Sequence, residues 1–227
     1  MSRRAKTGTC TYCHQHRPLT RDHIPPRSLF PKIPPDKLIT VPACKPCNEG
    51  FQKDDDYFWL NISLREPHHG DHEHATDAAQ RALQHLNRPA ATGARQALLD
   101  NTERTPVYTT MGLYAGTRLA YNTDLDRLSK TANRIITGLY YHTTKKRLQP
   151  PYTAKSRALD GFTTDDNHDL QTLLSIVNPQ PITTIGDIFA YQYHLLTEDL
   201  QASIWLLTFY QTTTFIGTTL KQQDHTW

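Results

Sequence analysis

The chain has 227 residues and a mass of 26.0 kDa, a length that fits one or two domains with cores of their own. Hydrophobic residues make up 37% of it and charged residues 21%, and the mean hydropathy is −0.63, which is typical of a polar globular protein rather than a disordered one. No apolar run approaches the roughly 20 residues that span a bilayer, and the basic start lacks the apolar segment of a secretory signal, so we expect a cytoplasmic protein that does not bind membranes.

Charge is distributed unevenly along the chain. The formal net charge is +3, yet residues 1–53 carry ten Lys and Arg against three Asp and Glu, a balance of +7, and the rest of the chain has a balance of −4. A basic first quarter favours contact with a polyanion in that region. Residues 1–9 are polar and basic, and we expect them to form a mobile arm.

All four cysteines lie in the basic quarter, as two C-x2-C pairs, Cys10 with Cys13 and Cys44 with Cys47. In a reducing compartment such pairs are more typical of metal binding than of disulfides. Four thiolates form the tetrahedron of a structural Zn²⁺ site, and no cysteine is left over. The spacing therefore predicts structural zinc, with two redox pairs or free thiols as the alternative.

The first fifty residues predict short elements around these cysteines. Eight prolines between residues 18 and 46 exclude a long helix before Cys47. Short strands are expected around 19–24 and at 38–41. A helix is expected to begin near Cys47 and to run to about residue 65, with Gly50 weakening its first turn.

The rest of the chain predicts helices followed by strands, after a loop at 66–75. The amphipathic pattern of 124–142 is the clearest helical signal. Together these elements predict the α+β class, with an N-terminal zinc-bound domain over 1–65 and a mixed helical and β-rich C-terminal domain over 76–227. The expected helices are 76–87, about 94–100, 124–142 and 167–177; extended structure is expected over 105–121, and two strands or one bent strand over 188–196 and 202–220.

Three polar residues are spaced to act together near the cysteines. Zinc would bring the strand with Asp22 and His23 beside the helix start at Asn48. Asp22 and Asn48 can supply two oxygens to one hard cation, Mg²⁺ or Mn²⁺. His23, with a pKa near neutrality, can remove a proton from water. The alternatives are a surface turn at Asp22–His23 and a simple helix cap at Asn48.

The segments C-x2-C, DHIPPRS and VPACKPCN, in that order, resemble the zinc-knuckle branch of the HNH, or ββα-metal, endonucleases. The resemblance covers about residues 10–60. It implies a one-metal fold that hydrolyses phosphodiester bonds, most often in DNA, with His23 as general base and Asp22 and Asn48 as metal ligands. Many members of the family have an asparagine a few residues before the second cysteine pair, where this chain has Lys37.

Basic side chains near this segment are candidates for contact with nucleic acid, which is the expected partner, DNA in particular. Arg21 and Arg27 flank the Asp-His pair, and Lys37 can touch a phosphate. The alternative for the two arginines is solvated surface charge. The main rival function is a catalytically inactive zinc-knuckle module that binds nucleic acid. A third function, a thiol redox protein, does not explain the DHIPP segment. The sequence is also compatible with a homodimer.

Other clusters have simpler expectations. The run Asp54–Asp56 is expected to solvate one face of its helix rather than to hold a second cation. The histidine-rich stretch 68–74 is expected to be a flexible loop rather than a metal site. Aromatic side chains further along are expected in the core or at an interface, with base stacking as the alternative for the first group: Tyr140, Tyr141 and His142, then Trp205, Phe209, Tyr210 and Phe215.

Overall fold

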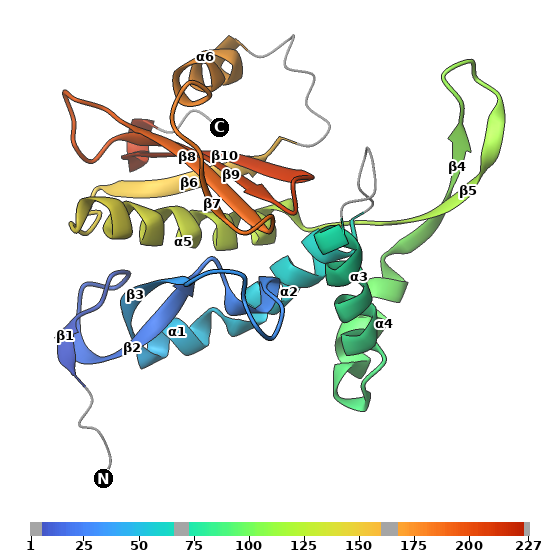
Figure 1. Cartoon of the computed structure of the whole chain (residues 1–227), viewed down its shortest axis with the longest axis horizontal. Helices are drawn as coiled ribbons and strands as arrows, with labels where there is room; N and C mark the ends of the chain where they lie inside the picture. The colour runs from blue at the N-terminus through green and yellow to red at the C-terminus, as the bar shows by residue number, and fades with distance from the viewer. Residues whose placement is uncertain (1–5, 66–72, 160–167, 225–227) are drawn as a thin grey trace.

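The computed structural model describes residues 6–65, 73–159 and 168–224 (Figure 1). Over these ranges the chain is a mixed α+β protein, as the sequence predicts, and its strands pair in three antiparallel sheets. None of the helices within the same ranges combines the length and the apolar character needed to cross a bilayer.

The N-terminal part is a three-stranded sheet followed by two short helices. Both predicted strands are confirmed, and they pair in register from Leu19 opposite Cys44 to Ile24 opposite Ile39. The predicted helix divides in two at Phe51, directly after Gly50. The elements are β1 (Thr7–Thr9), β2 (His16–Ile24), β3 (Ile39–Cys44), α1 (Lys45–Gly50) and α2 (Gln52–Ser63), with the sheet order β1-β2-β3.

The first strand corrects the expectation of a mobile arm over residues 1–9. Thr7 to Thr9 pair with β2, with Thr7 opposite Pro18 and Thr9 opposite His16. Strand pairing gives these residues a structure that their own composition does not indicate, because the ladder depends on the partner strand. Residues 1–5 lie outside the described part of the chain.

The middle of the chain forms two helices and a hairpin that stands clear of the rest of the protein (Figure 1). Both predicted helices and the predicted extended stretch are confirmed. The register of the hairpin shifts at a bulge between Val107 and Tyr108. The elements are α3 (Glu73–Leu86), α4 (Thr92–Asp100), β4 (Thr102–Tyr108) and β5 (Tyr114–Tyr121).

The C-terminal part is a long helix against a five-stranded sheet. The amphipathic segment is confirmed as a helix, which Asp124 caps by accepting a hydrogen bond from the Arg127 N–H. The elements are α5 (Leu125–Thr144), β6 (Tyr152–Ala158), α6 (His168–Val177), β7 (Thr183–Ile185), β8 (Phe189–Leu195), β9 (Ser203–Phe209) and β10 (Thr213–Lys221), in the sheet order β6-β10-β9-β8-β7.

The strand count in this sheet corrects the sequence analysis. The stretch 202–220 is a hairpin of two strands, β9 and β10, and β8 precedes it. Tyr210 and Gln211 form the turn with φ values of 48° and 60°, a left-handed conformation that is uncommon for residues other than glycine, asparagine or aspartate. The turn therefore has no sequence signal. β6 and β7 were also not predicted, since short strands within a sheet depend on their neighbours.

Helix α5 lies between the five-stranded sheet and the N-terminal part (Figure 1). A single hydrophobic cluster runs through all three layers, from Ile24 on β2 through Ile135 on α5 to Phe215 on β10. A Cβ atom at Gly138 would lie 2.6 Å from the Ile24 side chain, so glycine permits the close approach of α5 to β2. Of the residues predicted for the core or an interface, Tyr141 and His142 are only partly buried. The others are buried: Tyr140, Trp205, Phe209, Tyr210 and Phe215. The division into domains at 1–65 and 76–227 stays a prediction, although both stretches contribute to this one core.

Candidate metal centre and active site

The four cysteines come together at one end of the three-stranded sheet. Their sulfur atoms all lie within 4.8 Å of one another, and those of Cys13 and Cys44 are 3.6 Å apart. Zn–S bonds of about 2.3 Å in a tetrahedron place the sulfurs about 3.8 Å apart, so the spacing fits a structural zinc ion. A disulfide needs about 2.05 Å, and all four thiols are free. The chain therefore has a four-cysteine site that can hold zinc.

The backbone around the cysteines favours a thiolate at Cys10. The N–H groups of Tyr12 and Cys44 donate to its sulfur at 3.4 and 3.3 Å. Burial opposes ionisation of this thiol, but the backbone hydrogen bonds bring the pKa of Cys10 down to about 7. The thiolate is the form that binds a metal ion. Because Cys44 ends β3 and Cys47 lies in the first turns of α1, a bound ion would fix the start of that helix.

Beside the cysteines, Asp22, His23 and Asn48 line one pocket of about 240 Å³. Asp22 and His23 are neighbours near the end of β2, and Asn48 lies on α1. The amide nitrogen of Asn48 donates to Thr20 Oγ1 at 2.9 Å, which ties α1 to β2. The fold thus brings together the three residues that the sequence analysis selected.

Asp22 is bound by residues that the sequence analysis did not identify. The Arg134 guanidinium, from α5, donates from Nη1 to the two carboxylate oxygens at 2.9 and 2.7 Å, and the Tyr12 hydroxyl donates at 2.5 Å. Burial and the charge of Asp22 raise the pKa of Tyr12, so the hydroxyl keeps its proton. A carboxylate has about four acceptor positions. These three hydrogen bonds leave about one position for a cation.

Arg134 also joins a second acidic residue to this network. Its guanidinium pairs with Asp55 on α2 as well as with Asp22, and it lies 4.7 Å from the centre of the Phe51 ring. Only 4% of the Arg134 side chain is exposed. Burial raises the pKa of Asp55 to about 7, against the lowering effect of Arg134, and the charge of Asp22 raises it further. The Arg134 guanidinium is therefore the counter-ion of two carboxyl groups, the buried Asp22 and the partly buried Asp55.

The position of Arg134 carried a signal in the sequence. It lies three residues after Thr131 and four before Gly138, on the face of α5 that packs inward, where a charged residue needs a partner. Such a residue indicates a buried ion pair but not which carboxylate it meets. Asp22 is 112 residues away in the sequence, and only the tertiary fold brings the two together.

His23 has the protonation behaviour that the candidate role requires. The side chain is partly buried, and burial lowers the pKa of His23, with Arg27 lowering it further and Asp22 opposing both. The neutral imidazole is therefore favoured at neutral pH, and only this form can accept a proton.

The three candidate substrate-binding residues differ in position. Arg27 lines the pocket, and its guanidinium donates to the backbone carbonyls of Phe30 and Lys32. Arg21 is exposed on β2, next to Asp22, and Lys37 is exposed in the segment before β3. The fold therefore places Arg27 at the pocket and leaves Arg21 and Lys37 on the surrounding surface.

The acidic run on α2 is only partly the solvated face that the sequence analysis expected. Asp56 is exposed, as expected. Asp54 pairs with Arg127 at 2.7 Å and Asp55 pairs with Arg134, both from α5, so these two residues join α2 to α5. The histidine-rich stretch gives no comparable test, because His68, His69, Asp71 and His72 lie outside the described residues.

Comparison of the chain with known protein families, with curated proteins and with solved structures found no match.

Proposed function

We propose that this chain is a metal-dependent endonuclease of the HNH type that hydrolyses phosphodiester bonds in nucleic acid, with DNA as the first substrate to test. The observation that supports the proposal most is the single pocket shared by Asp22, His23 and Asn48. Strand β2 carries Asp22 and His23, and α1, which follows the antiparallel strand β3, carries Asn48. Zinc at the four cysteines would hold these elements together. The basic first quarter of the chain suits a polyanionic substrate.

In this proposal each residue has a defined task. His23 removes a proton from the attacking water, because its imidazole is neutral at working pH. Asn48 and Asp22 would hold Mg²⁺ or Mn²⁺, through the amide oxygen and the remaining acceptor position of the carboxylate. A cation bound there would neutralise negative charge on the phosphate. Zinc at the four cysteines would contribute to folding rather than to the reaction.

Nicking of supercoiled plasmid in Mg²⁺ or Mn²⁺ tests the proposal. The variant His23→Ala should lose activity by about 10²–10⁴-fold, the usual contribution of a general base. His16→Ala is the matched control, because His16 lies on the same strand but outside the pocket. The assay should include single-stranded, branched and RNA substrates. Equal cleavage by wild type and His23→Ala would remove His23 from the base role.

A second function is favoured by one observation, the neutralisation of Asp22 by Arg134. A carboxylate that already has a buried counter-ion binds a metal ion more weakly. Weak metal binding at Asp22 would favour a module that binds nucleic acid without cutting it. Binding of plasmid with no cleavage at any metal concentration would favour this function. Cleavage that depends on His23 would exclude it.

A further inference from the structure

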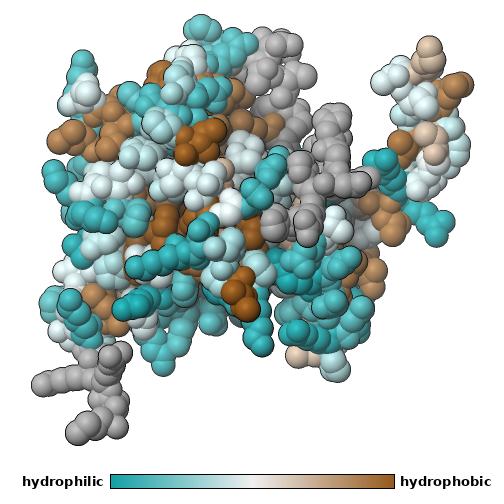
Figure 2. Space-filling view, in the orientation of Figure 1, coloured by the Kyte–Doolittle hydropathy of each residue, from teal (hydrophilic) through white to brown (hydrophobic). Residues whose placement is uncertain are grey.

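Most of the exposed large hydrophobic side chains in the described chain fall within one stretch of the sequence. Within the described chain, eleven large hydrophobic side chains are exposed, and eight of them fall between residues 83 and 125. The β4–β5 hairpin carries five of the eight, and hydrophobic side chains follow it in the space-filling view (Figure 2). The eight are Leu83, Leu99, Tyr108, Met111, Leu113, Tyr114, Leu119 and Leu125.

The hairpin presents a hydrophobic face that no layer formed by the described residues covers. The register places Tyr108 opposite Tyr114, and Arg104 opposite Leu119, so Tyr108, Tyr114 and Leu119 share a face. The centres of the two tyrosine rings are 6.0 Å apart, and the rings pack edge to face. The side chains of Tyr108 and Leu119 are 59% and 72% exposed. A two-stranded hairpin is marginally stable in water by itself, and covering this face would stabilise it.

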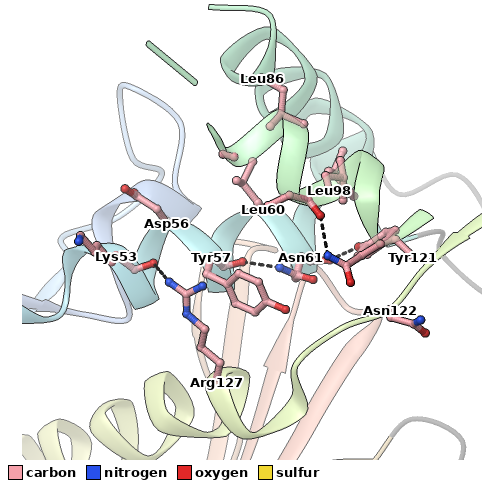
Figure 3. A pocket seen from close by; sticks show the side chains of 14 residues that line it. Lys53, Asp56, Tyr57, Leu60, Asn61, Leu86, Leu98, Tyr121, Asn122 and Arg127 are labelled. Carbon is pink, nitrogen blue, oxygen red and sulfur yellow. Dashed lines mark hydrogen bonds between the residues drawn. The ribbon is translucent and has the colours of Figure 1, made fainter. Parts of the chain in front are cut away.

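A hydrophobic pocket lies at the foot of the same hairpin (Figure 3). Its volume is about 340 Å³, and α2, α4, the end of β5 and the start of α5 surround it. Leucine side chains from the helices gather on one side of it, while Lys53 and Asp56 lie on the other. Tyr121, the last residue of β5, lines it and donates to the Asn61 carbonyl at 2.9 Å. The lining leucines are Leu60, Leu64, Leu86 and Leu98.

We propose that two copies of this chain form a two-fold dimer in which the hairpin tip of each copy enters the pocket at the hairpin foot of the other. Each chain has both a hairpin tip and a pocket at the hairpin foot. A two-fold dimer therefore contains two equivalent contacts, and in each of them the tip of one copy fills the pocket of the other. Met111 and Leu113 at the tip are 87% and 66% exposed and match the leucine lining in chemistry.

The exposed area is sufficient for a stable dimer. At about 120 Å² for each exposed tyrosine and about 60 Å² for each aliphatic side chain, the eight residues offer on the order of 600 Å² of apolar surface per copy. A stable interface buries about 800 Å² per partner, of which about 60% is apolar. The hairpin region can therefore supply the apolar part of such an interface.

Charge argues against nucleic acid as the occupant of this surface. Residues 83–125 contain four Arg and three Asp or Glu, a balance of +1, whereas residues 1–53 have a balance of +7. A surface that binds the phosphate backbone needs clustered Lys and Arg. The basic part of the chain is thus suited to nucleic acid, and the hairpin region to a protein surface.

The mass of the full chain in solution, measured by light scattering across micromolar concentrations, tests the proposal. Wild type should approach twice 26.0 kDa. Leu113→Asp removes a tip side chain, and Ala97→Trp fills the pocket from α4. Each should raise the dimer Kd at least about tenfold, about 1.4 kcal/mol. Ile182→Asp is the control, because Ile182 is 64% exposed, like Leu113, but lies outside the region.

Mixing the two variants separates this dimer from others. The Ala97→Trp chain keeps its tip and the Leu113→Asp chain keeps its pocket, so the mixture retains one of the two contacts and should associate more tightly than either variant alone. A dimer that packs hairpin against hairpin would show no gain on mixing and no effect of Ala97→Trp, and either result would overturn the proposal.

Further outcomes also count against the dimer. A wild-type chain that stays monomeric at every concentration contradicts it without any variant. A monomer whose plasmid binding falls with Leu113→Asp but not with Ile182→Asp would assign the hairpin to nucleic acid instead. Circular dichroism and thermal melting should establish that each variant is folded before its mass is compared.

Discussion

The three-stranded sheet β1–β3 and the hairpin β4–β5 are both small antiparallel structures, but they are stabilised in different ways. The first has four cysteines at one end that can hold zinc, and its Asp22 pairs with Arg134 of α5. The hairpin contains no cysteine, and its exposed tyrosines and leucines face outward. A small sheet that brings metal ligands and buried ion pairs can fold against its own chain, whereas one that exposes hydrophobic residues needs a partner.

Among the tests of that difference, removal of one cysteine should have the largest effect on stability. Cys44→Ser should lose bound zinc and destabilise the N-terminal part by several kcal/mol, because zinc binding supplies folding energy. Zinc content by mass spectrometry and thermal melting measure the effect. Lys45→Ser is the control, since the neighbouring Lys45 side chain is 71% exposed. A full zinc content and an unchanged melting temperature in Cys44→Ser would mean that the cysteines are not the ligands.

Loss of the buried cation should come next in size. Arg134→Met leaves the buried Asp22 and the partly buried Asp55 without this counter-ion and should lower the free energy of unfolding by about 3–5 kcal/mol. Denaturant unfolding measures the change. Light scattering on the same sample should find the self-association of the hairpin region unaltered, since Arg134 lies outside it.

A second arginine of the same helix provides the matched control. Arg127→Met removes the pair with Asp54, but the Arg127 side chain is 33% exposed, so the expected loss is about 1 kcal/mol. Equal losses in the two variants would show that burial does not strengthen the Arg134 pair. Replacing Asp22 and Asp55 by asparagine in the Arg134→Met background should recover part of the stability.

The smallest expected effect is on the pH dependence of stability. The pKa of Asp55 is about 7 in the folded chain, against 3.8 ordinarily, so the folded state holds a proton that the unfolded state releases. This contribution is complete below pH 3.8 and is lost as pH rises to about 7. Asp55→Asn should remove that decline, seen as a flatter plot of unfolding free energy against pH. Asp126→Asn, at an exposed residue of α5 that is not among the groups shifting Asp55, should leave the slope as in wild type.

Sequence patterns predicted those parts of the site that depend on local spacing. Two C-x2-C pairs indicated a four-cysteine cluster, and Asp22, His23 and Asn48 were selected from their distance to it. The amphipathic period identified α5. The turn at Tyr210 and the strand at Thr7–Thr9 were missed, because their residues favour neither structure without a neighbouring strand.

The amino-acid order alone determined the four-cysteine cluster, the amphipathic helix α5 and the position of the basic charge, since these follow from residue chemistry and from short-range periodicity. Only the folded chain decided that Arg134 meets Asp22 and Asp55, and that the hairpin turns its hydrophobic side chains outward beside a hydrophobic pocket. Contacts between residues a hundred positions apart depend on how the layers pack, and a residue's burial is a property of what covers it.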